Sequence, residues 1–481
     1  MFPTIIQGGM GVAVSNYRLA KAVSKAGQLG VVSGTMLDTV LARRLQDGDA
    51  DGSIRRAIKS FPFQEIASRV IEEYFIDGGK QSSSPYKAVP MHSLRSSQHL
   101  IELTILANFV EVFLAKEGHD GVVGINYLTK IELPTLPSLF GAMIAGVDFV
   151  LMGAGIPKAI PGILDRLSEK QAVSMKIDVE GSTADDRYCV EFDPAIYPLQ
   201  QERLKRPKFL AIVSSVALAQ SLAKKSSGKV DGFVVEHHTA GGHNAPPRGG
   251  VKVDENGEPI YGPKDEINPE DFQKLGLPFW LAGGYGTPDG LQIALQSGAM
   301  GVQIGSLFAF CSESGISDYI KTRVIEAVKS EDTKVFTDPR ASASSYPFKV
   351  IPLSTSLSDE QIYLTRNRIC DLGYLRQAYK RDDGTVGFRC SGEPVEAFVR
   401  KGGAEEATCG KKCLCNGLMA TVGLPQVQKG GYTEPPLVTA GKYLAEIGKI
   451  VGQQKGSYSA EDVINYISAP GKFSESSQLS A

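Results

Sequence analysis

The chain has 481 residues, of which 42% are hydrophobic and 22% charged, and its formal net charge at pH 7 is −2. A chain of this length exceeds the usual size of one hydrophobic core, so we expect one large domain and a smaller second unit. The near-neutral charge and the absence of a basic stripe argue against a nucleic-acid-binding protein.

The sequence also bears on the expected compartment. The N-terminus has no basic region followed by an apolar core, and a strand-like run begins at once with "PTIIQ". The longest apolar run, residues 140–157, contains Asp148 and several glycines, which indicates a helix end, a turn and a buried strand rather than a membrane span. Seven cysteines, an odd number, do not suggest a secreted disulfide framework. We therefore expect a cytoplasmic protein that binds no membrane, and no motif indicates its oligomeric state.

Short apolar, β-branched runs recur in chain order and end in glycine or polar residues. They occupy residues 4–9, 28–34, 121–128, 146–155, 208–215, 230–242, 278–286 and 301–308. Helix-like segments such as 16–27, 100–118, 216–226 and 287–299 separate them, and this alternation indicates a parallel sheet. Eight units predict an α/β fold, a (β/α)8 TIM barrel, whose usual size is about 250 residues before insertions. An open doubly wound sheet is the alternative, but no GxGxxG follows the first strand.

The barrel domain is expected to span residues 1–345, with polar insertions at about 50–94 and 175–207. The second insertion is expected to form a hairpin excursion. Residues 346–481 lack the strand–helix rhythm and contain two helix-like stretches, 358–379 and 435–451. We predict a helical cap domain over the barrel mouth, with a disordered tail at 474–481.

The run "HHTAGGHNAPPRGG", residues 237–250, begins at the end of the sixth predicted strand and holds three of the six histidines. In a TIM barrel the working residues lie where strands run into the loops that follow them. Glycine-rich turns after the seventh and eighth strands form the usual phosphate cradle of such a barrel. The backbone amides of Gly283, Gly284, Gly305 and Ser306 are therefore predicted to bind a phosphate, although these glycines could also be plain turn residues.

Five segments in register with the strands carry a family resemblance. "PTIIQGGMG", "GINYL", "TAGGHNAPPRG", "LAGGYG" and "GVQIGSLF" together resemble the FMN-dependent nitronate monooxygenases, also called 2-nitropropane dioxygenases, over residues 3–330. The superfamily includes enoyl-thioester reductases and a dehydrogenase–isomerase branch of fatty-acid synthesis. The resemblance implies an oxidoreductase that oxidises nitronates with O2 to a carbonyl compound and nitrite, or else acts on enoyl or acyl thioesters of fatty-acid or polyketide synthesis. A non-catalytic flavin-binding sensor is a third hypothesis.

The resemblance also implies roles for individual residues. It assigns catalysis to His243, whose imidazole has an ordinary pKa near ~6.5 that suits proton transfer; the alternative is that this ring only holds its loop. FMN is favoured over FAD because the chain lacks a dinucleotide fingerprint. Glu236 stands where the family has glutamine, and a carboxylate there would disfavour negative charge on the reduced flavin unless it is protonated or turned away. The residues implied to contact FMN are Gly8, Gly9, Met10, Asn126, Glu236, Gly241, Gly242, Gly283, Gly284, Gln303, Gly305 and Ser306.

Two clusters raise the question of metal. His237 and His238 have no acidic or cysteine residue at ligand spacing beside them, so the sequence does not favour a metal there. Cys390, Cys409, Cys413 and Cys415 fall close together, and they are predicted to bind an iron–sulfur cluster or, as a weaker alternative, zinc. Their spacing fits no standard motif, and the other hypothesis is a packed cluster of reduced thiols. Cys370 precedes them on a predicted helix.

Overall fold

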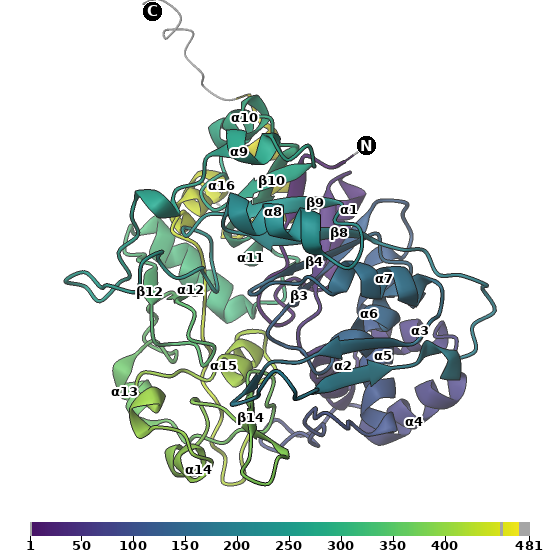
Figure 1. Ribbon diagram of the computed structural model, residues 1–481. Coiled ribbons are helices and arrows are strands. Elements are labelled where there is room, and N and C mark those ends of the chain that lie inside the picture. The colour runs from purple at the N-terminus through teal and green to yellow at the C-terminus, as the bar shows by residue number, and fades with distance from the viewer. Residues whose placement is uncertain (1, 453–455, 471–481) are drawn as a thin grey trace, which may run out of the picture.

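The computed structural model describes residues 2–452 and 456–470 (Figure 1). The predicted disordered tail at 474–481 lies outside the described residues.

Eight parallel strands close into a barrel, which confirms the predicted TIM-barrel fold and all eight predicted strands. Strand β1 pairs with both β2 and β11, so the sheet has no free edge. Inside the barrel Trp280 is fully buried and packs with Ile6, Leu151 and Val234. In chain order the strands are β1 (Ile5–Gln7), β2 (Leu29–Ser33), β3 (Val123–Leu128), β4 (Phe149–Gly153), β8 (Lys208–Val213), β9 (Gly232–Glu236), β10 (Phe279–Ala282) and β11 (Gly301–Ile304).

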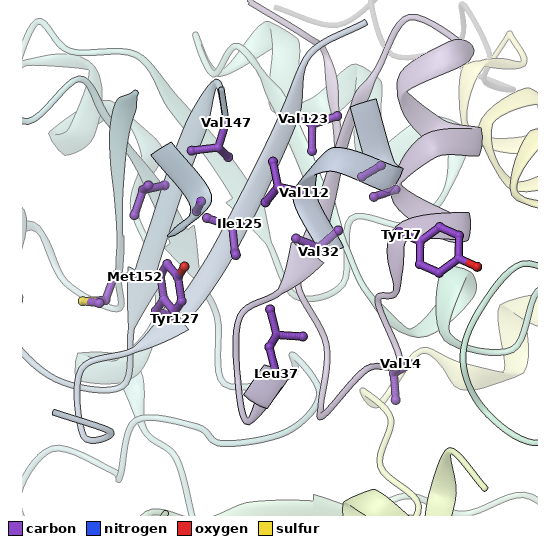
Figure 2. Packing of buried hydrophobic residues seen from close by; sticks show 14 of the residues in the cluster. Val14, Tyr17, Val32, Leu37, Val112, Val123, Ile125, Tyr127, Val147 and Met152 are labelled. Atoms are coloured by element: carbon purple, nitrogen blue, oxygen red, sulfur yellow. The ribbon is translucent and has the colours of Figure 1, made fainter. Parts of the chain in front are cut away.

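Helices pack on the outside of the strands. Figure 2 shows Ile125 and Tyr127 of β3 and Val32 of β2 among side chains from the helices, including Val112 and Tyr17. Helix α5 is long and apolar enough to cross a membrane, but 78% of its most apolar window is buried inside the structure, as in the core helix of a globular domain. The covering helices include α1 (Tyr17–Lys25), α5 (Gln98–Lys116), α6 (Thr135–Ile144), α7 (Ile160–Ser168), α8 (Val216–Lys225), α10 (Pro288–Gln296) and α12 (Asp318–Lys329).

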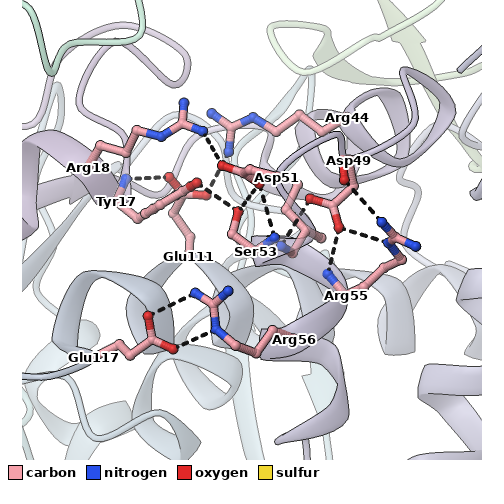
Figure 3. Close-up of polar contacts among 11 residues, drawn as sticks. Tyr17, Arg18, Arg44, Asp49, Asp51, Ser53, Arg55, Arg56, Glu111 and Glu117 are labelled. Carbon is pink, nitrogen blue, oxygen red and sulfur yellow. Dashed lines mark hydrogen bonds and ion pairs between the residues drawn. The ribbon is translucent and has the colours of Figure 1, made fainter. Parts of the chain in front are cut away.

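The first insertion is anchored by buried polar contacts. It contains α3 (Ser53–Lys59) and α4 (Gln64–Tyr74), and it follows α2 (Leu37–Gln46). Buried Glu111 of α5 accepts from the backbone N–H of Tyr17 at 2.7 Å and pairs with Arg44 at 2.9 Å, and the Tyr17 hydroxyl lies 2.9 Å from that of Ser53 (Figure 3). One carboxylate therefore ties α1, α2 and α5 together.

The second insertion forms β5 (Val173–Lys176), β6 (Val179–Glu180) and β7 (Cys189–Phe192), with β5 and β7 antiparallel. Strand β6 adds to the hairpin of β14 (Gln377–Lys380) and β15 (Val386–Arg389). The insertion thus shares a sheet with the C-terminal segment, and the domain boundary at residue 345 stays a prediction.

The C-terminal segment is predicted to be mainly helical. In the structure it consists of short helices, short strands and long stretches without regular secondary structure. Its elements are β13 (Phe348–Val350), which pairs with β12 (Phe336–Asp338) of the preceding segment, and α13 (Glu360–Thr365), the hairpin β14–β15, α14 (Val395–Arg400), α15 (Leu414–Thr421), α16 (Ile447–Val451) and α17 (Ala460–Ser468).

The helix predicted over 358–379 is wrong beyond Thr365. There the buried guanidinium of Arg366 turns to the buried carboxylate of Glu434 at 2.6 Å. The side-chain amide of Gln428 then bonds to the carbonyl of Asn367 at 3.0 Å. The carbonyl of Asn367 thus accepts a tertiary hydrogen bond instead of one from a following helical turn. The helix predicted over 435–451 is likewise confined to its end, because residues 439–442 run along the barrel mouth.

Candidate active site

One cavity of about 240 Å³ lies where the barrel strands run into their following loops. Every residue predicted to contact FMN lines this cavity, and so does His243. The structure therefore brings the whole predicted set to one place, from the ends of β1, β3, β9, β10 and β11.

The loops after β10 and β11 present polar hydrogens to the cavity. Gly283 and Gly284 have φ of +85° and +88°, a left-handed conformation that glycine adopts without strain. The backbone N–H groups of Gly283, Gly284, Gly305 and Ser306 donate to no acceptor in the described part of the chain. The Ser306 hydroxyl accepts from the N–H of Gly441 at 2.7 Å, so its own hydrogen is left to donate. This edge of the cavity suits a phosphate.

The loop after β1 and the side chain of Gln303 form another wall. A Cβ added to Gly9 would lie 2.3 Å from the Cβ of Asn126, so only glycine fits there. The N–H of Met10 donates to Ser15 Oγ at 3.0 Å, which holds the loop in place. Oε1 of Gln303 is buried and has no hydrogen-bond partner among the described residues. Buried polar atoms are usually paired, so this oxygen is suited to accept a hydrogen bond from a bound ligand.

His243 is held by its loop and by a serine. Asn244 N–H donates to the carbonyl of Pro347 at 2.9 Å, and Nε2 of His243 lies 2.8 Å from Ser342 Oγ. Burial and then the charge of Lys130 lower the pKa of His243 to about 4. The imidazole is therefore neutral at pH 7. In this form it can make hydrogen bonds and can accept a proton, but it is a poor proton donor, so of the predicted acid and base roles only the base role fits this pKa.

Glu236, at the end of β9, interacts electrostatically with the buried Lys349. Burial raises the pKa of Glu236 to about 7, against the opposing effect of Lys349. Burial and the charge of Lys442 lower the pKa of Lys349 to about 7. Lys349 Nζ also contacts the carbonyl of His238 and Oδ1 of Asn244. The raised pKa of Glu236 favours its protonated form near neutral pH, and a protonated carboxyl can donate a hydrogen bond.

The other two loop histidines lie outside this cavity lining. Nδ1 of His237 contacts Thr239 Oγ1 at 2.8 Å, and the ring of His238 stacks on Tyr261 with centroids 4.0 Å apart. The fold also brings Glu266 to them, with the three ligand atoms within 4.8 Å of one another. The sequence missed this acidic partner because it lies beyond the loop. Glu266 is 65% exposed, and its carboxylate oxygens lie 3.4 Å from Nε2 of His237 and 3.9 Å from Nε2 of His238.

Sequence reasoning missed a further wall of the cavity. Thr439, Gly441 and Tyr443 line it, and the N–H of Lys442 donates to the carbonyl of Thr239 at 3.0 Å. A Cβ on Gly441 would lie 2.9 Å from that same carbonyl oxygen. The available signal was the pair of prolines at 435–436, which interrupts a helix before a run of small residues.

The cysteines that lie close together in the structure are not the four that the sequence spacing predicts. Cys390, Cys413 and Cys415 lie together, but Cys409 is exposed and does not join them. Cys370, from the irregular chain after α13, takes its place.

Residues 173–345 match the nitronate monooxygenase family. The match covers the loops with His243, Gly283 and Gly305, and it confirms the resemblance for this part of the chain. The nitronate monooxygenase match leaves out the segments around Gly9 and Asn126.

Relatives of known name match over similar short stretches. A probable nitronate monooxygenase of Bacillus subtilis is 32% identical over 136 residues, covering 28% of this chain and 37% of that protein. One from Staphylococcus aureus strain JH9 is 28% identical over 134 residues, covering 28% and 36%. A Mycobacterium tuberculosis protein named (3aS,4S,5R,7aS)-5-hydroxy-7a-methyl-1-oxo-octahydro-1H-indene-4-carboxyl-CoA dehydrogenase is 28% identical over 135 residues, covering 28% and 34%. The chain thus spans about a third of the length of these relatives.

Solved structures align over nearly the whole chain at low similarity. FabK from Thermotoga maritima has a TM-score of 0.46 and 16% identity, covering 97% of this chain and 91% of that one. Nitroalkane oxidase from Streptomyces ansochromogenes has a TM-score of 0.46 and 12% identity, covering 97% and 95%.

Proposed function

We propose that the protein is an FMN-dependent oxidoreductase that oxidises alkyl nitronates with O2 to a carbonyl compound and nitrite. The observation that carries this proposal is the convergence of the predicted FMN contacts and His243 on one cavity. The nitronate monooxygenase match supports it, because the matched residues supply the histidine loop and both phosphate loops.

The residues of the cavity fit FMN. The free amides of Gly283, Gly284, Gly305 and Ser306 would hold the phosphate, and Gln303 Oε1 would accept from the flavin ring. Gly9, which leaves no room for a Cβ beside Asn126, would let backbone lie along the ring. When bound, FMN supplies an acceptor for electrons from the substrate carbon.

His243 and its neighbours would position the nitronate. Because the His243 imidazole is neutral, it would bind an oxygen of the nitro group by a hydrogen bond, with the ring orientation set by Ser342. The charge of Lys130, which already acts on His243, would favour the anionic substrate. In the overall reaction the carbon–nitrogen bond breaks, and two nitronates and one O2 give two carbonyl compounds and two nitrites.

The proposal is tested by the visible absorption spectrum of the purified protein and by an activity assay with a nitronate and O2. The purified protein should release FMN on denaturation, and propionate 3-nitronate should give O2 consumption and nitrite. Protein that is colourless and binds no FMN on reconstitution would overturn the flavin assignment. Flavin-loaded protein that releases no nitrite would overturn the nitronate assignment alone.

The second candidate is oxidation or reduction of an acyl thioester. It is favoured by the similarity to the carboxyl-CoA dehydrogenase of Mycobacterium tuberculosis. In that reaction His243 and protonated Glu236 would bind the thioester carbonyl. An acyl-CoA that reduces the flavin without O2, or an enoyl-CoA that reoxidises the reduced flavin, would select this candidate over nitronate oxidation.

A further inference from the structure

Four of the seven cysteines meet beside the cavity, from three separate parts of the chain. Cys370 follows α13, Cys390 follows β15, and Cys413 and Cys415 lie at the start of α15. We propose that these four cysteines bind a four-iron iron–sulfur cluster. The set differs from the one that sequence spacing predicts, because Cys370 replaces Cys409.

Backbone and side-chain contacts hold the three segments together. Nδ2 of Asn416, next to Cys415, donates to Oδ1 of Asp371, next to Cys370, at 2.8 Å. A Cβ added to Gly392 would lie 3.7 Å from Sγ of Cys390 and 3.9 Å from Cα of Cys413. The turn after Cys390 therefore touches the start of α15, and the site is built by the fold.

The four sulfurs lie within electrostatic reach of one another. Cys370, Cys390 and Cys413 all act electrostatically on Cys415, and Cys413 acts on both Cys370 and Cys390. The four side chains are therefore neighbours in the fold. Cysteine thiolates are the usual ligands of iron–sulfur clusters.

Two arginines face the sulfurs. Among the charged groups that act on Arg366, Cys413 is the strongest, and Nη1 of Arg366 is buried without a hydrogen-bond partner in the described residues. Cys370, Cys390 and Cys415 all act on Arg376. Nε of Arg366 is paired with Glu434, so it is the unpaired Nη1 that would donate to a sulfur of a bound cluster, which is anionic when four thiolates hold it.

The arrangement of the sulfurs bears on which metal the site would hold. Among the described residues, the cysteines do not form a group whose ligand atoms all lie within 4.8 Å of one another. Tetrahedral zinc, with Zn–S bonds of about 2.3 Å, would draw its thiolates to roughly 4 Å apart. In a four-iron cluster each cysteine binds a different iron, so the sulfurs stand wider. Cys415 also lines the cavity, which places the cluster at its wall.

The test measures metal in the full-length protein, purified and reconstituted without oxygen using iron and sulfide. We expect about four iron and four sulfide per chain and a broad visible absorption that dithionite bleaches. Cys370→Ser and Cys415→Ser should lose most of the iron. Cys409→Ser is the matched control and should keep it, and circular dichroism checks that each variant folds.

Three outcomes would overturn the proposal. The first is stoichiometric zinc in place of iron in the wild-type protein. The second is no metal, with all four thiols titrating in the folded protein after reconstitution. The third is loss of iron in Cys409→Ser and its retention in Cys370→Ser. FMN content is measured separately, so the flavin proposal and the cluster proposal fail independently.

Discussion

The N–H of Gly242 donates to Oγ1 of Thr439 at 3.0 Å, and this bond joins residues 197 positions apart in the chain. On the next residue, His243 faces the cavity. On the other side of the loop, the N–H of Lys349 in β13 donates to the carbonyl of Gly242 at 3.0 Å. The histidine loop is thus held by two elements that lie outside the barrel strands.

Thr439→Val removes the acceptor of this bond but keeps the shape of the side chain. An unsatisfied N–H at Gly242 should cost about 1–3 kcal/mol, expressed as lower thermal stability and weaker turnover with the nitronate. Thr439→Ser keeps the hydroxyl and is the control. Turnover and melting temperature that are the same for valine and serine would show that the bond does not support the loop.

His243→Ala should keep FMN and lose turnover. Removal of one hydrogen-bonding group from the reacting atoms typically costs about 10²–10³ in rate. Ser342→Ala, which removes the hydroxyl beside Nε2 of His243 together with its contacts to Ser344, should show a smaller loss of kcat. We would abandon the catalytic assignment if His243→Ala turned over at the wild-type rate with FMN bound.

The low pKa of His243 predicts a dependence of stability on pH. The folded protein keeps this ring neutral down to about pH 4, whereas the unfolded chain takes up a proton near the ordinary value of 6.5. The contribution to stability is therefore complete above pH 6.5 and is lost as the pH falls toward 4. Calorimetry at pH 7 and pH 5 should show a smaller drop in melting temperature for His243→Gln than for wild type. An equal drop in both proteins would contradict the assigned pKa.

Glu236 should affect FMN binding through its proton. Its pKa of about 7 means that the carboxyl ionises as the pH rises through neutrality, which places negative charge beside the flavin. We expect the Kd for FMN to rise between pH 6 and pH 8.5 in wild type. Glu236→Gln, which cannot ionise, should give a flatter profile with affinity at pH 6 close to wild type. Identical profiles would indicate that the carboxyl does not reach the ring.

Gly9→Ala should block cofactor binding by a steric effect. The new Cβ would lie 2.3 Å from the Cβ of Asn126, so either the loop or the asparagine must move into the flavin space. The expected result is folded protein with FMN affinity reduced at least about tenfold, equivalent to 1.4 kcal/mol. Gly262→Ala, where nothing lies within 4 Å of the added Cβ, is the matched control. Retention of yellow colour by Gly9→Ala at wild-type stoichiometry would remove Gly9 from the site.

The sequence by itself determined that the chain forms a barrel and which loops lie at the mouth of that barrel. Strands and helices leave a local periodic pattern, and all eight barrel strands follow from it. Gly283, Gly284 and His243 could be placed at the mouth for the same reason, because the loops after the strands of a TIM barrel share one face.

Only the tertiary structure decided which distant groups meet. Thr439 and Cys370 come from segments whose local pattern resembles helix, and buried partners such as Glu434 override that pattern. Spacing along the chain favoured Cys409 over Cys370, but the fold leaves Cys409 exposed. The protonation of Glu236 and His243 likewise depends on burial and on charges from Lys349 and Lys130, and distances between such groups arise only when the chain is packed.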